Sequence, residues 1–346
     1  MNANSFGNRI VMHTFGESHG RAMGVVIDGF PAGVPIDVSV VQKFLDRRKP
    51  GTSGLVSQRK ELDKVEIVSG VYKNLSLGTP ICAWVLNQNA RSEDYEGIRE
   101  QPRHGHADKV WLDKFGHIDH RGGGRSSGRE TLCRVIAGSL CEQALENVVP
   151  NLRVVGLASK IGEFECDRNL ADAADRNSVD LFAARFPFKN SKFISEKLEA
   201  AQAKGDSYGG IAEITIYNPP KGLGQPVFHK LKSDLASAAM SLGATLAVDF
   251  AEGFESIERN GIAFHSNQKV SQYGGIQGGI SSGQTIRFRV YFKPTSSILD
   301  VAKKGRHDPC IVPRAIPVLE AMTSFIIMDH WMLLRMDRIS GLEIVK

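Results

Sequence analysis

The strongest chemical signal in the chain is the stretch 121–130, which reads Arg-Gly-Gly-Gly-Arg-Ser-Ser-Gly-Arg-Glu. Helical periodicity follows at once and predicts a helix over 130–148. Free backbone N–H groups at a helix start, together with hydroxyls and guanidinium groups, bind phosphate. Arg125 and Arg129 could face one ligand if the turn is helical. Alternatively, one of the serines only caps the helix; since capping does not require three arginines, the stretch favours an anion site.

Two histidine-containing segments are candidates for proton transfer. Gly16-Glu-Ser-His-Gly20 follows a predicted strand, and Arg103-His-Gly-His-Ala-Asp108 lies in a predicted loop. Histidine gives and takes a proton near neutral pH, and neighbouring glycines leave room for a substrate. A single histidine is more often a packed polar residue, so each segment depends on the rest of the site for support.

The second histidine segment also allows a metal-site hypothesis. His104, His106 and Asp108, followed by further imidazoles and a carboxylate over 117–120, have spacings that can build a zinc site. Lys109 stands where the last histidine of the H-x-H-x-D-H pattern of binuclear metallohydrolases would be. An ammonium group beside the proposed ions disfavours this hypothesis, and no metal ligand is assigned.

Three later loops combine small hydroxyl residues or glycines with a cation or a proton acceptor. They are Gly-Gly-Ile-Ser-Ser-Gly over 278–283, Lys-Pro-Thr-Ser-Ser over 293–297 and Arg-His-Asp-Pro over 306–309. Asp308 beside His307 could tune a proton acceptor. Any one of these loops could be a turn, but together they predict a large polyanion site assembled from remote parts of the chain.

Other motifs are less specific or missing. Arg47-Arg-Lys-Pro-Gly51 closes a predicted helix, where cations ordinarily complement the helix dipole, and only its companions make it a candidate anion contact. No G-x-G-x-x-G after a strand, no Walker A sequence and no H-E-x-x-H occurs. Dinucleotide, nucleoside triphosphate and zincin functions therefore lose their usual sequence support.

Mixed helices and strands must position these groups. The 346 residues, 42% of them hydrophobic, can bury a large core. Segment 167–192 is interpreted as an insertion or irregular connection, without a domain boundary. Alternating patterns predict strands over 9–14, 65–68, 212–217 and 285–292. Helical periodicity is clearest over 38–47, 130–148, 231–242 and 316–335.

Composition narrows the classes of partner. The net charge is +5, but Lys and Arg are interspersed with Asp and Glu and no basic stripe carries interleaved aromatics, so we expect small anions and no nucleic acid. The five cysteines form no C-x-x-C pair, which is typical of reduced compartments. No signal peptide or membrane span is indicated, so we expect a cytoplasmic protein without membrane contact.

Five of these motifs together resemble those of chorismate synthases. They are Gly-Glu-Ser-His-Gly at 16–20, Arg-Gly-Gly-Gly-Arg-Ser-Ser at 121–127, the loops 278–283 and 293–297, and Gly-Arg-His-Asp-Pro-Cys at 305–310. They occur in the family's order. The resemblance implies an α+β fold of the β-α-β sandwich type, with helices layered between antiparallel sheets, in a single domain 1–346 that forms a homotetramer.

The resemblance also implies a reaction. The family eliminates phosphate from 5-enolpyruvylshikimate-3-phosphate in a 1,4-anti sense to give chorismate, the last step of the shikimate pathway to the aromatic amino acids. The reaction needs reduced FMN without net redox change, and the protein positions the flavin and manages protons. Since no reductase domain is visible, an external flavin reductase is expected, with NADPH as an indirect reductant.

Site residues are carried over by matching the motifs. His19 is expected to protonate the leaving phosphate, His106 to act near the flavin N1 and C2 carbonyl, and Asp308, with its neighbour, to help take the proton from flavin N5. The expected FMN contacts are Arg125, Ser126, Ser127, Gly243, Ala244, Gly278, Lys293, Pro294, Thr295, Ser296, Ser297 and Arg306. The expected substrate contacts are Ser18, Arg48, Arg103 and Arg129.

The chain departs from the family pattern near this site. Gly54 stands in place of a common arginine, whose phosphate contact Arg59 could supply, and His104 in place of a proline. Gly243-Ala244 replaces Asn-Ala, segment 267–273 lacks the usual His-Ala, and the loop 298–305 is short. Three function classes stay open: the lyase, a flavin-binding homologue with little turnover, and a metal-dependent hydrolase using His104, His106 and Asp108.

Overall fold

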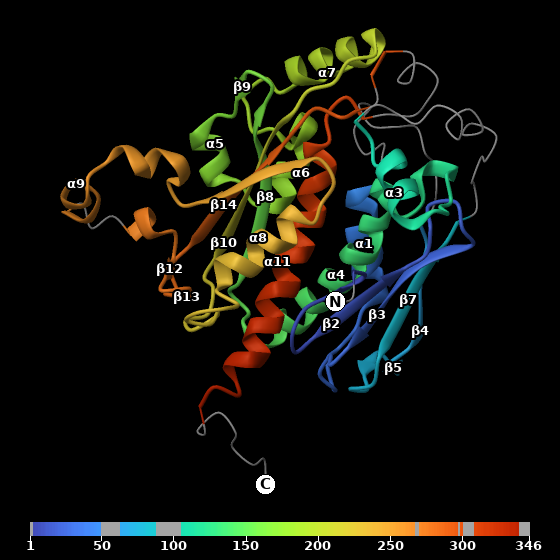
Figure 1. Ribbon diagram of the computed structural model, residues 1–346. Coiled ribbons are helices and arrows are strands. Elements are labelled where there is room, and N and C mark those ends of the chain that lie inside the picture. Colours follow the sequence, from blue (N-terminus) through green and yellow to red (C-terminus); the bar gives the residue numbers. More distant parts are fainter. Residues whose placement is uncertain are drawn as a thin grey trace.

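Two antiparallel five-stranded sheets enclose the long helices of the protein (Figure 1). The computed structural model describes residues 3–49, 63–87, 105–266, 270–296, 298–299 and 308–338. The first sheet has the order β1-β2-β3-β7-β4. Its strands are β1 (Ser5–Phe6), β2 (Val11–Phe15), β3 (Ala22–Asp28), β4 (Val65–Ser69) and β7 (Ile81–Leu86).

The second sheet has the order β11-β14-β10-β8-β9. Its strands are β8 (Arg153–Ile161), β9 (Phe164–Glu165), β10 (Gly210–Tyr217), β11 (Thr245–Phe250) and β14 (Ile286–Phe292). Alternating side chains of β14 are buried, as expected for a strand with one face against a core. All four strands predicted from the sequence are confirmed, as β2, β4, β10 and β14.

The helices between the sheets form two packed layers. Helices α1 (Val38–Arg48) and α4 (Thr131–Val148) lie next to the first sheet, and α8 (Leu231–Met240) and α11 (Val312–Leu334) next to the second. At Gly138 in α4 a Cβ would lie 2.1 Å from the carbonyl oxygen of Ala321 in α11, so only glycine allows these helices to approach so closely. All four predicted helices are confirmed. The apolar segment of α11 packs into the core and is buried around most of its circumference.

Segment 167–192 differs from the irregular connection that we expected. It contains α5 (Arg168–Ala173), α6 (Arg176–Leu181) and the 3₁₀ turn η4 (Ala183–Arg185). Asp167 and Asp175 cap the two helices through their side chains, and Asp175 forms a reciprocal capping box with Ser178. The prediction of an irregular connection was wrong because these helices are too short to show a clear apolar period, while the insertion stays a prediction.

The remaining elements are short or lie at the surface. The hairpins are β5 (Val71–Tyr72) with β6 (Leu75–Ser76) and β12 (Ile276–Gln277) with β13 (Ile280–Ser281). The other helices are α3 (Asp108–Phe115), α7 (Lys192–Lys204) and α9 (Gly261–Ser266), and the other 3₁₀ turns are η2 (Arg121–Ser126), η3 (Gly128–Glu130), η5 (Gly253–Glu258) and η6 (Val270–Tyr273). No helix among the described residues is long and apolar enough to span a membrane.

Candidate active site

The Gly-Glu-Ser-His-Gly loop after β2 packs against the glycine run of η2. The Ser18 N–H donates to the Gly124 carbonyl at 3.3 Å, and the Ser18 hydroxyl lies 3.2 Å from His19 Nδ1. A Cβ at Gly122 would lie 2.1 Å from His19 Nδ1, and Gly122 also has a φ of +61°. Only glycine suits both constraints. Two motifs about one hundred positions apart in the sequence thus form one corner of the site, with Ser18 and His19 buried in it.

The arginines of stretch 121–130 contact different partners, because the stretch is not the regular helical turn that facing one ligand required. Gly122–Gly124 have positive φ values, so the chain turns away from a regular helix before α4 begins. Arg121 pairs with Asp119 at 2.8 Å. Arg125 instead reaches the end of β2, where it donates to Thr14 Oγ1 at 2.6 Å.

The third arginine of the stretch joins Arg48 in a buried cluster. Asp63 Oδ2 accepts from Arg48 Nη2 at 3.1 Å, and Asp63 Oδ1 lies 2.9 Å from Arg129 Nη1. The side chains of all three are at most 5% exposed. Arg129 Nε also donates to Asn87 Oδ1 at 2.8 Å, and Asn87 in turn donates to the Gly20 carbonyl. The cluster is thereby connected to the histidine loop.

This cluster holds more positive than negative charge. The pKa of Arg48 is lowered to about 10, chiefly by burial; Asp63 opposes the shift, and the neighbouring Arg314 and Arg129 add to it. Burial disfavours the charged form of Arg48, and Asp63 is a single carboxylate between two guanidinium groups. An anionic ligand that reached Arg48 would therefore relieve repulsion already present in the protein.

Arg314, near the start of α11, connects this cluster to the acidic candidate Asp308. Arg314 Nη1 forms an ion pair with Asp308 Oδ2. Asp308 is 8% exposed, and its Oδ1 has no hydrogen-bond partner among the described residues. Asp308 is the residue that the sequence predicts to help take a proton from the flavin.

Part of the set expected to contact flavin lies beside Asp308, whereas Gly278 belongs to the β12–β13 hairpin at the other end of β14. Thr295 Oγ1 donates to the Asp308 carbonyl at 3.2 Å, and the Lys293 N–H donates to the Ala244 carbonyl at 3.0 Å. A Cβ at Gly105 would lie 3.7 Å from Ser296 Cβ, so the half-buried His106 follows a residue that lies close to this loop. Segments 105–106, 244, 293–296 and 308 thus lie together.

The serines of the predicted site make local contacts, whereas two of its glycines adjoin open space. Ser126 Oγ donates to the Gly123 carbonyl, and Ser127 Oγ accepts from the Arg129 N–H, so both serines make local turn and capping contacts. A Cβ at Gly243 or Gly278 would meet nothing within 4 Å, so both adjoin open space. Pro294 lies beside Gly209. Arg103, Ser297 and Arg306 lie outside the described residues, as do Gly54, Arg59, His104 and His307.

A cavity of about 170 Å³ adjoins η2 and α3. Trp111 and Phe115 of α3 and the polar residues Glu17, Arg125 and Ser126 line it. His117, Asp119 and His120 also line this cavity. No three histidine, cysteine, aspartate or glutamate side chains within the described ranges lie together as metal ligands, so this part of the chain adds no support for the hydrolase alternative.

Comparison with known proteins assigns this architecture to one family. The family model described as chorismate synthase matches residues 10–332. The chain belongs to the chorismate synthase family. It is 54% identical over 342 residues to the chorismate synthase of Bdellovibrio bacteriovorus, covering 98% of this chain and 100% of the relative. The chorismate synthase of Ruegeria pomeroyi is 41% identical, with 97% of each chain covered.

A solved structure titled as a crystal structure of chorismate synthase aligns with a TM-score of 0.75 at 26% identity, covering 94% of this chain and 93% of that one. The recognition of the family, the α+β fold with helices between antiparallel sheets, and membership of this lyase family are thereby confirmed.

Sequence reasoning missed three residues that contact the candidate site residues. Asp63 and Asn87 belong to no motif, and no sequence signal marks them. Arg314 did leave a signal, because a cation in the first turn of a helix opposes the helix dipole and implies a specific partner. In the structure this partner is Asp308.

Proposed function

We propose that this chain eliminates phosphate from 5-enolpyruvylshikimate-3-phosphate to give chorismate, using reduced FMN without net redox change. The observation that carries the proposal is the pair of buried arginines Arg48 and Arg129 with the partly exposed Arg314, which is only partly compensated by Asp63 and Asp308 and is connected to the His19 loop. Buried guanidinium groups suit a substrate that carries a phosphate and two carboxylates. The match to chorismate synthases over nearly the whole chain supports the same reaction.

The substrate contacts are assigned to Ser18, Arg48, Arg103 and Arg129. Ser18 lies beside His19, which places a hydroxyl donor and a proton donor at the same corner. In this assignment His19 protonates the departing phosphate. Because Arg48 and Arg129 share one carboxylate, their guanidinium groups are held near each other, and guanidinium groups can bind an anion through two donors.

The convergent loops fit a flavin mononucleotide. Backbone and hydroxyl groups over 293–296, beside Ala244 and its neighbour Gly243, form a cradle without bulky side chains, and Lys293 adds a cation for a phosphate. Reduced FMN would supply, and afterwards recover, the electron that lets the C–O bond break. The contacts proposed for it are Arg125, Ser126, Ser127, Gly243, Ala244, Gly278, Lys293, Pro294, Thr295, Ser296, Ser297 and Arg306.

His106 and Asp308 are proposed to handle the protons of the flavin. His106 would act near the flavin N1 and C2 carbonyl. Asp308 would help take the proton from N5 through its unpartnered Oδ1, while Arg314 keeps the other oxygen in place. The functional unit is proposed to be one domain over 1–346, in a cytoplasmic homotetramer. Its flavin would be reduced by an external reductase, with NADPH as the indirect reductant.

The test is anaerobic phosphate release from 5-enolpyruvylshikimate-3-phosphate with dithionite-reduced FMN. Both His106→Ala and Asp308→Ala are expected to lower kcat about a hundredfold or more, because positioned acids and bases contribute on this scale. His13→Ala is the matched control, since His13 is exposed on β2 and contacts the Ser5 hydroxyl.

Three results would contradict the proposal in different ways. Flavin binding without phosphate release by the parent protein would identify a homologue that has lost turnover. Flavin-independent release that a chelator abolishes would favour the metal hydrolase. Unchanged kcat in both variants would keep the lyase but remove His106 and Asp308 from its chemistry.

A further inference from the structure

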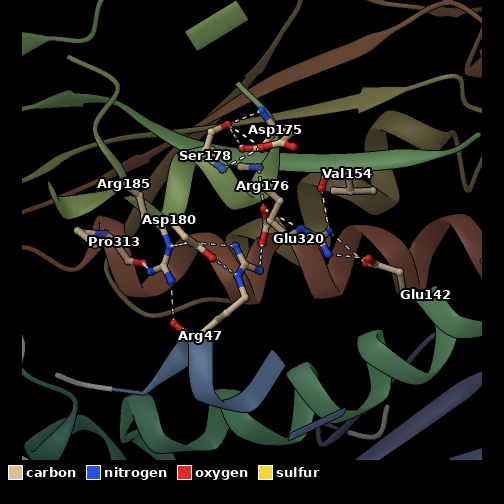
Figure 2. Close-up of polar contacts among 11 residues, drawn as sticks. Arg47, Glu142, Val154, Asp175, Arg176, Ser178, Asp180, Arg185, Pro313 and Glu320 are labelled. Carbon is tan, nitrogen blue, oxygen red and sulfur yellow. Dashed lines mark hydrogen bonds and ion pairs between the residues drawn. The ribbon is translucent and has the colours of Figure 1, made fainter. Parts of the chain in front are cut away.

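Arg185 joins the ends of two helices that carry site residues. Figure 2 shows its guanidinium group between α1 and α11, with each nitrogen directed at a different acceptor. Nε contacts Asp180 Oδ1 at 2.6 Å, Nη2 donates to the Arg47 carbonyl at 2.9 Å, and Nη1 donates to the Pro313 carbonyl at 2.5 Å. The residue is 8% exposed and lies in η4 with a φ of +54°.

Both carbonyls lack a partner within their own helix. Arg47 lies in the last turn of α1, where carbonyls have no N–H four residues ahead within the helix. Pro313 would ordinarily accept from residue 317, but residue 317 is a proline and has no N–H. A single guanidinium group therefore satisfies one orphan carbonyl of each helix.

Each of these carbonyls immediately precedes an arginine of the anion site. Arg47 precedes Arg48, and Pro313 precedes Arg314, which pairs with Asp308. Arg48 and Arg314 are close enough that Arg314 lowers the pKa of Arg48. These like charges repel, so the two helix ends need an interaction that holds them together. The Arg185 guanidinium group supplies one, because it binds the carbonyl of the residue that precedes each arginine.

We propose that Arg185 is a positioning residue that sets the spacing between Arg48 on α1 and the Arg314–Asp308 pair on α11. The proposal rests on the anion site described above. Segment 167–192 then has a role in the reaction although Arg185 itself does not reach the substrate. It would hold both cations before the substrate arrives, so that binding does not have to bring them together.

A network of ion pairs around Arg185 keeps its guanidinium group in a fixed orientation. Asp180 also contacts Arg47 Nε at 2.6 Å, and Arg47 Nη1 contacts Glu320 at 2.7 Å (Figure 2). Burial opposes ionisation of Asp180, but Arg47 and Arg185 outweigh it and lower the pKa of this carboxyl below its ordinary value. A lysine at position 185 would keep the charge but could not direct three planar donors at three separated acceptors.

The test compares Arg185→Lys with Arg176→Lys in the FMN-loaded enzyme. Arg176 is a matched control because it lies in the same network, where it contacts Glu142 at 2.6 Å and Glu320 at 3.4 Å and donates to the Val154 carbonyl, and none of these three partners is adjacent to a site arginine. Thermal unfolding measures the stability lost by each variant. Steady-state phosphate release measures kcat and KM separately, and calorimetry measures the Kd of 5-enolpyruvylshikimate-3-phosphate.

We expect Arg185→Lys to raise KM and Kd roughly tenfold or more, since small displacements of binding groups have effects on this scale. Arg176→Lys is expected to lower thermal stability while both constants stay at the parent values. Equal constants in the two variants would overturn the positioning role and leave the proposed function intact. Absence of turnover in the parent protein would instead contradict the proposed function.

A second variant applies if Arg185→Lys does not yield folded protein. Asp180→Asn removes the carboxylate that fixes Arg185 Nε and leaves both acceptor carbonyls in place. It is expected to raise KM and Kd relative to Arg176→Lys. Unchanged constants would overturn the proposal.

Discussion

Gly122 controls the position of His19 by having no side chain. An added Cβ would lie 2.1 Å from His19 Nδ1, well inside contact distance, and the backbone there has a φ of +61°. Both the steric clash and the backbone strain would act on the loop that presents the imidazole. The glycine run of η2 thus shapes the site as well as providing backbone donors.

We therefore expect Gly122→Ala to lower kcat by about a hundredfold, because displacing a reacting group by about 1 Å has effects of this size. Anaerobic phosphate release measures the change. Gly33→Ala is the control, since Gly33 also has a positive φ of +78° but nothing lies within 4 Å of its Cβ position. An equal loss of kcat in both variants would attribute the effect to backbone strain and not to His19.

At the residue scale, the sequence indicated which charged side chains belong to the candidate site but not which of them contact one another. Arg48 and Arg129 were expected at the substrate and do share a buried carboxylate. Their common partner Asp63 belongs to no motif, because a single aspartate gives no periodicity or spacing to recognise. Arg125 was expected with Arg129, but the positive φ values of the glycines turn it toward β2.

At the element scale, Glu320 joins three parts of the fold from the middle of α11. It is fully buried, accepts from the Gly156 N–H of β8 at 2.8 Å, and pairs with Arg47 at 2.7 Å and Arg176 at 3.4 Å (Figure 2). These contacts offset the cost of burying its charge. The periodicity of α11 predicted a helix, but an acidic residue within an apolar segment gave no indication of its partners.

Glu320→Gln is expected to lower the free energy of unfolding by about 3 kcal/mol or more, since removing one partner of a buried pair leaves the other charges uncompensated. Urea unfolding followed by circular dichroism measures it. Glu165→Gln is the control, because the carboxylate of Glu165 is 73% exposed and pairs with Lys160 at the surface. Exposed pairs contribute at most about 1 kcal/mol. Similar losses in both variants would mean that the Glu320 network does not stabilise the fold.

The long elements were predictable from sequence because their apolar periods extend over several turns or alternations. The short helices α5 and α6 were not, because two turns cannot establish a period. Their N-terminal aspartates, Asp167 and Asp175, were the available signal. Because these helices were not predicted, Arg185 was not identified. Two of its acceptors, the carbonyls of Arg47 and Pro313, lie on helices far away in the sequence.

At the scale of the whole molecule, the sandwich brings remote loops to one site, and an exposed apolar arm extends from the opposite end of the second sheet (Figure 1). The arm comprises η5 and α9, with Phe254 58%, Ile257 81% and Ile262 82% exposed. It follows β11, an edge strand, on which Leu246 is 62% exposed. Several large apolar side chains exposed on one segment are typical of an interaction surface.

If the proposed homotetramer forms, a second copy of the chain covers this arm. The double variant Ile257→Glu with Ile262→Glu is then expected to give a smaller assembly, because burying two unpaired carboxylates at an interface is strongly unfavourable. Light scattering coupled to size exclusion measures the mass. Leu181→Glu is the control, since Leu181 is 88% exposed on α6, away from the arm. A tetramer of unchanged mass in the double variant would place the interface elsewhere, and a monomeric parent protein would remove the tetramer from the proposed function.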